Sequence, residues 1–333
     1  MTKRVKIYEI HKFNNFIFDT IYFLLMSPLK IMEIHKKDPI NIINIHNFTY
    51  FLIIPFIIRK FFRIPILIKL PIDFTSFIRD TYMQKENKFR IRIMNYSWSK
   101  FFTKILIRKT DFIRTINEKM FNDLVNLKYP EKNILRIPNG INTKEFLGIK
   151  KLTHDNVHFG YVGRLIEFKN LRLLLRTFKL YLSKYPLDKL YIYGFGPEEI
   201  WISQYIMKNN LENNVILYGF EKDKAKIYSK IDVLIDTALA QGISNSILEA
   251  MCTNTFVIAS DVYGNTDLIK EKSTGLLFNP YNKYDLLKKL LFYKENPIIC
   301  QKIIINAKNE IINNFDINII TNKIYNFLKS RLL

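Results

Sequence analysis

The chain has 333 residues, 48% of them hydrophobic and 14% aromatic, with only 10 Gly and 11 Pro. This composition excludes a disordered or fibrous protein, and the length allows two domains of ordinary size, each with its own core. The net charge is +21, and residues 1–135 carry 24 Lys and Arg against 11 Asp and Glu. A basic surface attracts nucleic acid and anionic membranes alike, so charge alone does not identify a partner.

Residues 1–145 alternate between strand-like and helix-like patterns, which indicates a parallel, doubly wound sheet. Strands are predicted at residues 5–10, 40–45, 64–70, 112–115 and 134–137. Helices are predicted at 16–35, interrupted at Pro28, and at 50–62, 88–108 and 117–125. His46 follows one of these strands, at the sheet edge where sites form. A structural role and a catalytic role are both open to it, and the structural role is favoured.

A turn sequence at 138–142 and a polar stretch at 147–156 mark a change of domain. We therefore expect an N-terminal domain of residues 1–145 and a C-terminal domain of residues 146–333. In the second domain strands are predicted at 157–162, 189–193, 215–218, 232–235 and 256–259. Helices are predicted at 170–184, 198–208, 225–229, 245–251, 265–270, 284–294, 298–313 and 319–333. The pattern is typical of a second Rossmann-type unit.

A loop that follows the predicted strand 232–235 opens into a helix. The loop is rich in small or polar residues and reads Gly242, Ile243, Ser244 and Asn245. At such a place the backbone N–H groups and the positive end of the helix dipole can bind a phosphate. Glu249 lies about one turn further on, where its carboxylate can accept hydrogen bonds from a vicinal diol such as ribose. A nucleotide diphosphate would satisfy both groups.

Two cations, Arg164 and Lys169, lie on another predicted strand-to-helix loop, which begins at Gly163. An arginine fork and a lysine point charge on one loop can both reach the same diphosphate. The alternative is a pair of solvated surface cations, and the strand–loop–helix context favours the phosphate site.

The stretch at 194–198 holds two glycines, Gly194 and Gly196, between a predicted strand and a predicted helix. Pro197 and the missing third glycine argue against a dinucleotide-binding fingerprint. A tight turn that brings the backbone close to a ligand is the better interpretation, although a turn without ligand contact stays open.

Together with Thr274-Gly275-Leu276-Leu277, these segments resemble the donor site of family 4 (group 1) glycosyltransferases, the retaining enzymes of GT-B fold. The resemblance implies two Rossmann-like doubly wound domains that face each other across a cleft. It implies a nucleotide-diphosphate sugar as the donor, with Arg164 and Lys169 on the diphosphate and Glu249 on the ribose. It also implies that no metal and no other cofactor is needed, and that the segment at 264–267 flanks the same cleft.

Gln241 departs from the family pattern, in which two glutamates stand eight positions apart. Glu249 matches the second glutamate, and Gln241 occupies the place of the first, beside the donor sugar. A glutamine can exchange hydrogen bonds with sugar hydroxyls but supplies no negative charge to an oxocarbenium-like centre. We therefore expect donor binding to be retained better than rate, and a catalytically impaired nucleotide-sugar-binding relative is the alternative to an active enzyme.

The first domain matches the family only in its pattern. Nothing in residues 1–10 corresponds to the family's opening glycine-rich loop, so we expect an incomplete first domain. Where the family often has an acceptor-side histidine, the chain reads Leu70-Pro71-Ile72-Asp73, and Asp73 is a weak candidate for orienting an acceptor hydroxyl.

The expected acceptor is a glycan or a lipid-linked glycan. The basic, aromatic stretch at 88–104 suits either an anionic membrane surface or a solvated face. No nucleic-acid-binding module is recognisable, and a basic surface-binding protein without a nucleotide site is the remaining alternative. The apolar run at 48–58 is too short to span a bilayer.

Cys252 and Cys300 have no metal-ligand spacing, and two cysteines are too few for a disulfide scaffold. They indicate a reducing cytoplasmic setting, with peripheral binding at the inner membrane face as a further expectation. Cys252 is predicted to be a core residue.

Overall fold

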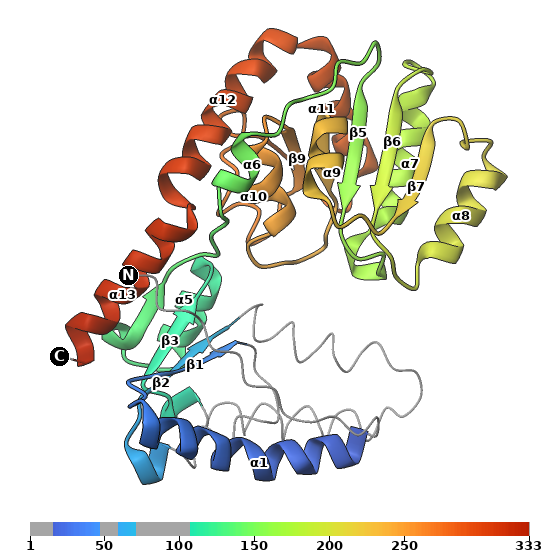
Figure 1. Ribbon diagram of the computed structural model, residues 1–333. Coiled ribbons are helices and arrows are strands. Elements are labelled where there is room, and N and C mark those ends of the chain that lie inside the picture. Colours follow the sequence, from blue (N-terminus) through green and yellow to red (C-terminus); the bar gives the residue numbers. More distant parts are fainter. Residues whose placement is uncertain (1–15, 47–58, 71–106, 333) are drawn as a thin grey trace. The chain divides into compact units, whose positions relative to one another are not determined.

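The computed structural model describes residues 16–46, 59–70 and 107–332 (Figure 1). The chain divides into two compact units. Unit 1 consists of Met1–Thr115 and Met120–Leu135, and unit 2 consists of Ile116–Lys119 and Arg136–Leu333. The predicted strand at 5–10, most of the predicted helix at 50–62, the stretch at 88–104 and Asp73 lie outside the described residues.

Unit 1 is built on a four-stranded sheet with the order β1-β2-β3-β4. The strands are β1 (Ile43–His46), β2 (Ile66–Lys69), β3 (Phe112–Thr115) and β4 (Ile134–Arg136). The pairs β1/β2 and β2/β3 are parallel. The strands β2 and β3 are almost wholly buried. Continuous apolar runs such as those that predicted these strands are typical of a parallel sheet that is covered on both faces.

Two helices of unit 1 were foreseen from the sequence. The helix α5 (Glu118–Asn126) lies where it was predicted. The helix α1 (Phe16–Lys37) runs without a break through Pro28, so the predicted interruption is wrong. A proline inside a helix removes one backbone hydrogen bond and crowds the preceding turn, but its fixed φ of about −65° is itself helical, so the helical backbone can continue on both sides.

Unit 2 is built on a six-stranded sheet with the order β10-β9-β8-β5-β6-β7, in which all neighbouring strands are parallel. The strands are β5 (His158–Val162), β6 (Lys189–Tyr193), β7 (Val215–Gly219), β8 (Val233–Asp236), β9 (Phe256–Ser260) and β10 (Leu276–Phe278). Counted from β7, this is the 3-2-1-4-5-6 order of a doubly wound fold, and the order reverses between β5 and β8. Five of these strands were predicted, and β10 was not.

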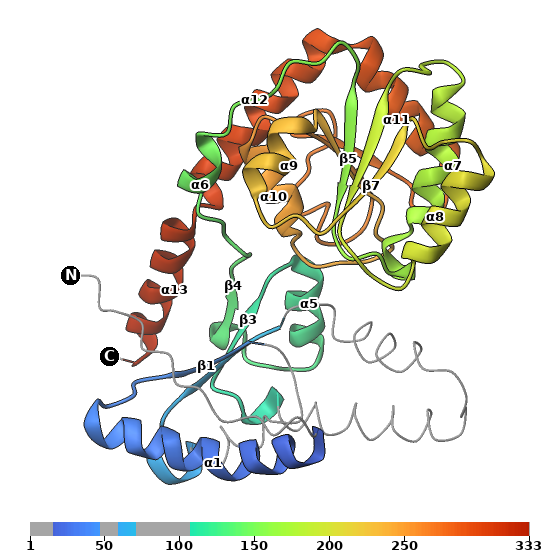
Figure 2. The same ribbon diagram turned by 45° about the vertical axis from the view of Figure 1, so that its right-hand side comes forward.

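Helices cover both faces of this sheet (Figures 1 and 2). The helices of unit 2 are α6 (Lys144–Leu147), α7 (Leu171–Leu182), α8 (Glu199–Lys208), α9 (Lys224–Lys230), α10 (Asn245–Cys252), α11 (Lys283–Glu295), α12 (Pro297–Asn314) and α13 (Ile317–Leu332). Apolar residues of α7, α8, α11 and α12 pack with the sheet into one core, while α9 and α10 lie on the opposite face. Both cysteines are buried, and Cys252 is a core residue as predicted.

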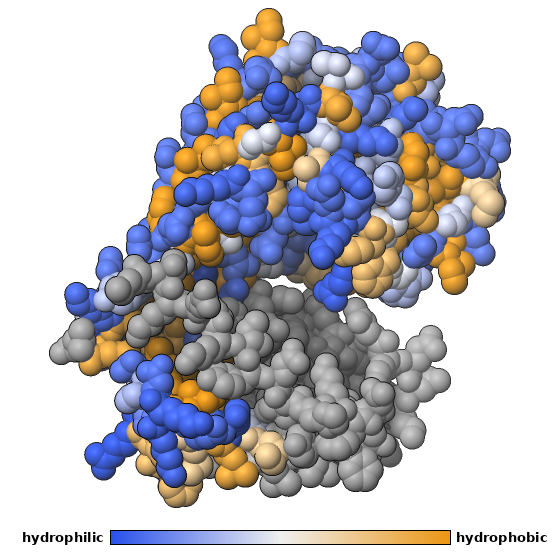
Figure 3. Space-filling model, viewed as in Figure 1, coloured by the Kyte–Doolittle hydropathy of each residue, from blue (hydrophilic) through white to orange (hydrophobic). Residues whose placement is uncertain are grey.

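The predicted helix at 265–270 is wrong, because residues 261–268 form turns. Gly264 has a φ of 91°, and its N–H donates to Asp267 Oδ2 at 3.2 Å. A positive φ and a local side-chain acceptor favour a turn over a helix at this place. In Figure 3, hydrophilic side chains cover most of the visible face of unit 2, with smaller hydrophobic patches between them. Within the described residues, no helix is long and apolar enough to cross a membrane.

Candidate active site

The loop between β5 and α7 presents a cation to solvent. Leu165 is completely buried and fixes the loop, while the Tyr161 hydroxyl donates to the Arg164 carbonyl at 2.8 Å. The Arg164 side chain is exposed, and within the part of the chain that the structure describes its guanidinium has neither a hydrogen bond nor an ion pair. An anion that approached this loop would therefore meet an unpaired guanidinium.

Gly194 and Gly196 are required by the packing of two loops. The φ values are 138° and 158°. A Cβ on Gly194 would lie 1.8 Å from the Gly163 carbonyl oxygen, and a Cβ on Gly196 would lie 2.4 Å from that of Leu165. The loop after β6 thus packs backbone to backbone against the loop after β5, which explains the glycines without a ligand. Direct contact of these glycines with a ligand stays a prediction.

Lys169, Gln241 and Asn265 form a hydrogen-bonded chain across three loops, those after β5, β8 and β9. Lys169 Nζ donates to Gln241 Oε1 at 2.5 Å, and Gln241 Nε2 donates to Asn265 Oδ1 at 2.6 Å. Asn265 is fully buried, and its own amide donates to the carbonyl and the hydroxyl of Ser260. The carboxyl ends of three strands therefore meet at one polar cluster, as the doubly wound fold requires.

Two residues at the end of β8, Asp236 and Thr237, contact Lys169. Neither was predicted as a site residue from the sequence. Asp236 Oδ2 lies 3.9 Å from Lys169 Nζ, and the Thr237 hydroxyl donates to the Lys169 carbonyl at 2.7 Å. Both residues are buried. Their position at the carboxyl end of β8 was the signal that could have identified them, because polar side chains at that edge of a parallel sheet converge on its site.

The N-terminus of α10 has backbone donors that are free to bind a ligand. Among the residues that the structure describes, no acceptor is found for the N–H groups of Gly242, Ile243, Ser244 and Asn245. Ser244 makes no side-chain cap, since its Oγ lies 2.9 Å from Ser246 Oγ instead. Uncapped N–H groups at the positive end of a helix dipole suit an anion such as phosphate.

Gly264 fits closely under this loop. A Cβ on Gly264 would lie 2.4 Å from the Gln241 carbonyl oxygen and 2.5 Å from that of Gly242. The turn after β9 and the loop after β8 are therefore in backbone contact, which fixes the approach to the helix N-terminus.

Glu249 lies on the first turns of α10 with its two oxygens in different surroundings. Oε2 accepts from the Tyr228 hydroxyl at 2.7 Å and lies 3.0 Å from Lys224 Nζ. Burial raises the pKa of Tyr228 well above its ordinary value, and the neighbouring Glu249 charge adds to the shift. The phenol therefore keeps its proton and acts as a donor. Neither Tyr228 nor Lys224 was foreseen as part of the site.

The other sequence candidates lie elsewhere or have local roles. His46 is the last residue of β1 in unit 1. The Thr274 hydroxyl accepts from the Lys270 N–H at 2.9 Å, and a Cβ on Gly275 would lie 2.9 Å from the Val257 carbonyl oxygen. Thr274 thus ends a tightly packed turn, and Leu276 and Leu277 are the first two residues of β10.

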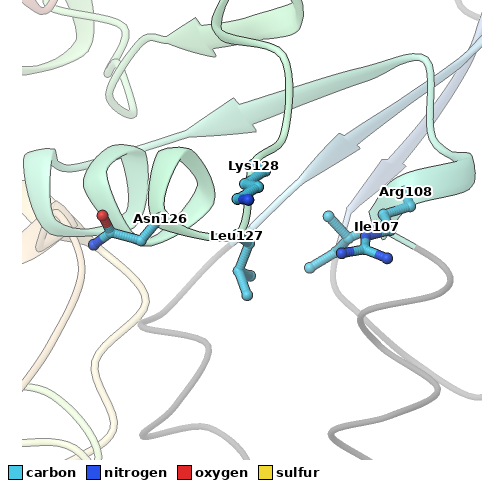
Figure 4. Close-up of a pocket in the computed structure, with 5 residues that line it drawn as sticks. All are labelled: Ile107, Arg108, Asn126, Leu127 and Lys128. Carbon is cyan, nitrogen blue, oxygen red and sulfur yellow. The ribbon is translucent and has the colours of Figure 1, made fainter.

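A separate pocket of about 190 Å³ lies in unit 1 (Figure 4). It is lined by Ile107, Arg108, Asn126, Leu127 and Lys128, none of which was predicted as a site residue. Over residues 16–46, 59–70 and 107–332, no group of three or more His, Cys, Asp or Glu is placed to hold a metal ion.

The fold places unit 2 among the doubly wound α/β proteins, and comparison with known proteins gives the family. Residues 143–310, half of the chain, match the family model described as glycosyl transferases group 1. The chain belongs to this family.

Two curated relatives illustrate the similarity. The chain is 29% identical over 281 residues to an uncharacterized glycosyltransferase of Methanocaldococcus jannaschii, covering 80% of this chain and 68% of that protein. It is 26% identical over 226 residues to the poly(ribitol-phosphate) alpha-N-acetylglucosaminyltransferase of Staphylococcus aureus, covering 67% of this chain but only 44% of that one.

Solved structures show the same architecture at low sequence identity. Anabaena Alr3699/HepE in complex with UDP has a TM-score of 0.74 at 17% identity, covering 95% of this chain and 85% of that one. A glycosyltransferase from Rickettsia africae also has a TM-score of 0.74 at 17% identity, covering 97% and 84%. The fold is therefore GT-B, as the motifs predicted.

Proposed function

We propose that the protein is a retaining, metal-independent glycosyltransferase that transfers a sugar from a nucleotide-diphosphate sugar to a glycan or lipid-linked acceptor. Solved structures of the same fold carry UDP and UDP-glucose, which supports the donor class. Relatives named for poly(ribitol-phosphate) and capsular polysaccharide synthesis support a role in cell-envelope polysaccharide or glycolipid synthesis.

The observation that carries the proposal is the open N-terminus of α10 beside Lys169. Four adjacent N–H groups without acceptors and a half-buried lysine meet at the carboxyl edge of the sheet. In this proposal the N–H groups and the two cations, Lys169 and Arg164, bind the diphosphate. They also offset the negative charge that develops on it as the sugar leaves, the role that a metal ion has in other transferases.

Retention results either from two inversions through a protein nucleophile or from attack by the acceptor on the face that the diphosphate leaves. The sequence places Gln241, whose amide is neutral, where the family has a carboxylate beside the donor sugar. Asp236, which lies near Lys169, is only 4% exposed. The proposed mechanism therefore uses no protein nucleophile and relies on positioning and on charge stabilisation.

Calorimetric titration of the full chain with UDP, GDP and ADP tests the donor site. We expect one nucleotide to bind in the micromolar range and the corresponding nucleotide sugars to be consumed when an acceptor is supplied. The anomeric configuration of the product, followed by NMR during turnover, tests retention. If none of the three nucleotides binds, the donor site is wrong and the enzyme assignment falls with it.

A catalytically impaired relative is the second candidate, and the amide of Gln241 is the observation that favours it. Both ends of that amide are engaged, Oε1 with Lys169 and Nε2 with Asn265. A side chain used in this way has fewer hydrogen-bonding positions left for a sugar. If this candidate is correct, wild-type protein binds nucleotide but transfers no sugar.

Gln241→Glu tests the impaired candidate directly. The substitution introduces the family's carboxylate next to Lys169. It also places an acceptor against Asn265 Oδ1, which in the wild type accepts a hydrogen bond from Gln241 Nε2. We expect kcat to rise more than the affinity for UDP. A kcat that falls or stays unchanged would show that the missing carboxylate does not limit the rate.

We also propose that transfer takes place at the inner face of the cell membrane, because the chain carries a net charge of +21. Cosedimentation with anionic and neutral vesicles across a salt series tests this surface, with duplex DNA as a competitor. Equal binding to vesicles and DNA by a protein that binds no nucleotide would favour the basic surface-binding alternative.

A further inference from the structure

The carboxylate of Glu249 offers one oxygen to a ligand, because the protein holds the other one. Tyr228 and Lys224 both contact Oε2. In the described part of the chain no hydrogen bond reaches Oε1. A carboxylate that is held on one side has a fixed orientation, so its open oxygen points in a defined direction.

Tyr228 is a rigid support for this carboxylate. Its side chain is completely buried, and its ring packs edge-on against Phe146 of α6, with the ring centroids 6.3 Å apart. The hydroxyl lies 2.7 Å from Glu249 Oε2 and 3.2 Å from the Ser246 carbonyl oxygen. Because it has a single hydrogen and two acceptors within reach, the shorter contact to the charged oxygen is the stronger bond.

Lys224 contributes a charge rather than packing. Its side chain is 43% exposed, whereas that of Glu249 is 11% exposed. An ion pair with one partner this exposed contributes little to the stability of a fold. The main role of Lys224 is therefore to orient the Glu249 carboxylate, and its contribution to the stability of the fold is minor.

We propose that Lys224 and Tyr228 are positioning residues that make the site selective for a ribose. They fix Glu249 Oε2, so that Oε1 accepts from the ribose hydroxyls of a nucleoside diphosphate. This inference rests on the proposed function and adds to it the residues that set the sugar preference of the nucleotide site. The same arrangement would reject a nucleotide without ribose hydroxyls, because the open carboxylate oxygen would then lose water without gaining a partner.

The test compares a ribonucleoside diphosphate with its 2′,3′-dideoxy form in calorimetric titrations of the full chain. The probe is whichever of UDP, GDP or ADP binds wild-type protein. We expect the wild type to prefer the ribose form by about ten- to a hundredfold, the range for a hydrogen bond to a charged acceptor. We expect Lys224→Met and Tyr228→Phe each to reduce this preference several-fold, and Lys224→Arg to retain it.

Lys226→Met is the matched control. Lys226 lies on the same helix, is exposed, and has no ion pair within the described residues. Removing either lysine lowers the attraction of the site for any diphosphate, so both variants weaken ribose and dideoxy forms alike through long-range charge. Only Lys224→Met should change the ratio of the two affinities. A purely structural or long-range electrostatic role would leave that ratio unchanged.

A second comparison asks whether Lys224 acts through Glu249. In a Glu249→Gln background, Lys224→Met should have no further effect on the ribose preference. An effect that persists there, or a ratio that is unchanged in both Lys224→Met and Tyr228→Phe, would overturn the inference. Equal wild-type binding of both forms would overturn it while leaving the diphosphate site intact. No binding of either form would overturn the proposed function as well.

Discussion

At the amino edge of the six-stranded sheet the buried ionisable side chains are hydrogen-bonded inside the protein, whereas at the carboxyl edge several polar groups have no partner among the described residues. Lys151 shows the first case. Its Nζ donates to the Tyr228 carbonyl at 2.9 Å, to the Thr255 hydroxyl at 2.6 Å and to the Ile231 carbonyl. These partners lie at the C-terminal end of α9 or just before β8 and β9, so one lysine joins the end of a helix to the starts of two strands.

Asp188 is a second buried ionisable residue at the amino edge, and it is paired with Lys294. It is 2% exposed and accepts from the Val157 N–H at 2.8 Å, the Tyr181 hydroxyl at 2.6 Å and Lys294 Nζ at 3.0 Å. A buried charge is tolerated when it is hydrogen-bonded and paired in this way.

The carboxyl edge keeps its donors and acceptors available. Arg164, the N–H groups at 242–245 and Glu249 Oε1 have no partner among the described residues. Both edges are formed by the same parallel strands. The difference in hydrogen bonding between them therefore comes from the residues in the loops and helices that adjoin each edge. Polar groups that are hydrogen-bonded inside the protein are occupied, and polar groups that are left without a partner are the ones available to a ligand.

The largest effect is expected at the amino edge. Asp188→Ala leaves Lys294 and two other donors without their acceptor, which should lower the free energy of unfolding of unit 2 by about 3–5 kcal/mol. Urea unfolding followed by the fluorescence of Trp201, in a Trp98→Phe background, reports on unit 2. The nearby exposed Asp155 serves as control, and Asp155→Ala should change stability by less than about 0.5 kcal/mol. If UDP affinity of the folded variant also fell, the separation of the two edges would be wrong.

The second effect depends on pH. Burial lowers the pKa of Lys151 from 10.5 to about 8, while the nearby charge of Asp232 opposes the shift. Between these values the unfolded chain binds the proton and the folded chain does not, so stability rises as the pH rises from about 8 to 10.5. The free energy of unfolding of wild-type protein should gain roughly 3 kcal/mol over this window relative to Lys151→Met. A difference that stays flat with pH would show that Lys151 titrates alike in both states.

At the carboxyl edge the expected change is in binding. Glu249→Ala removes a charged acceptor and should lower UDP affinity by about 1.5–3 kcal/mol, or ten- to a hundredfold. Calorimetric titration measures the loss directly. An unchanged affinity would remove Glu249 from the ribose site and would leave it as one more internally paired carboxylate, like Asp188.

The smallest effect is expected for Arg164. Its guanidinium is exposed, so Arg164→Ala should leave stability within about 0.5 kcal/mol of the wild type and lower UDP affinity by about 1 kcal/mol. Titration with uridine is the control, because a contact to the diphosphate cannot affect a ligand that lacks phosphate. Equal losses for UDP and uridine would show that the arginine does not bind the diphosphate.

The regular elements of unit 2 could be predicted because their signals are local. The apolar run at 189–193 corresponds to β6 residue for residue, and the loop before Asn245 was recognised as a helix start. The predictions failed where a local signal was ambiguous. Residues 265–270 have a helix-compatible composition, but the positive φ of Gly264 and the Asp267 carboxylate hold the segment in turns.

The sequence by itself determined the doubly wound pattern of unit 2, the loops that end its strands, the positions of Arg164 and Lys169 on one of those loops and the position of Glu249 on the helix that follows another. Periodicity, turn chemistry and strand-end position are properties of neighbouring residues, and a single sequence carries them. Only the tertiary structure decided the partners of these residues. The bonds from Lys169 to Gln241 and from Tyr228 to Glu249 join different loops and helices, and they form only because parallel strands bring their carboxyl ends to one edge of the sheet.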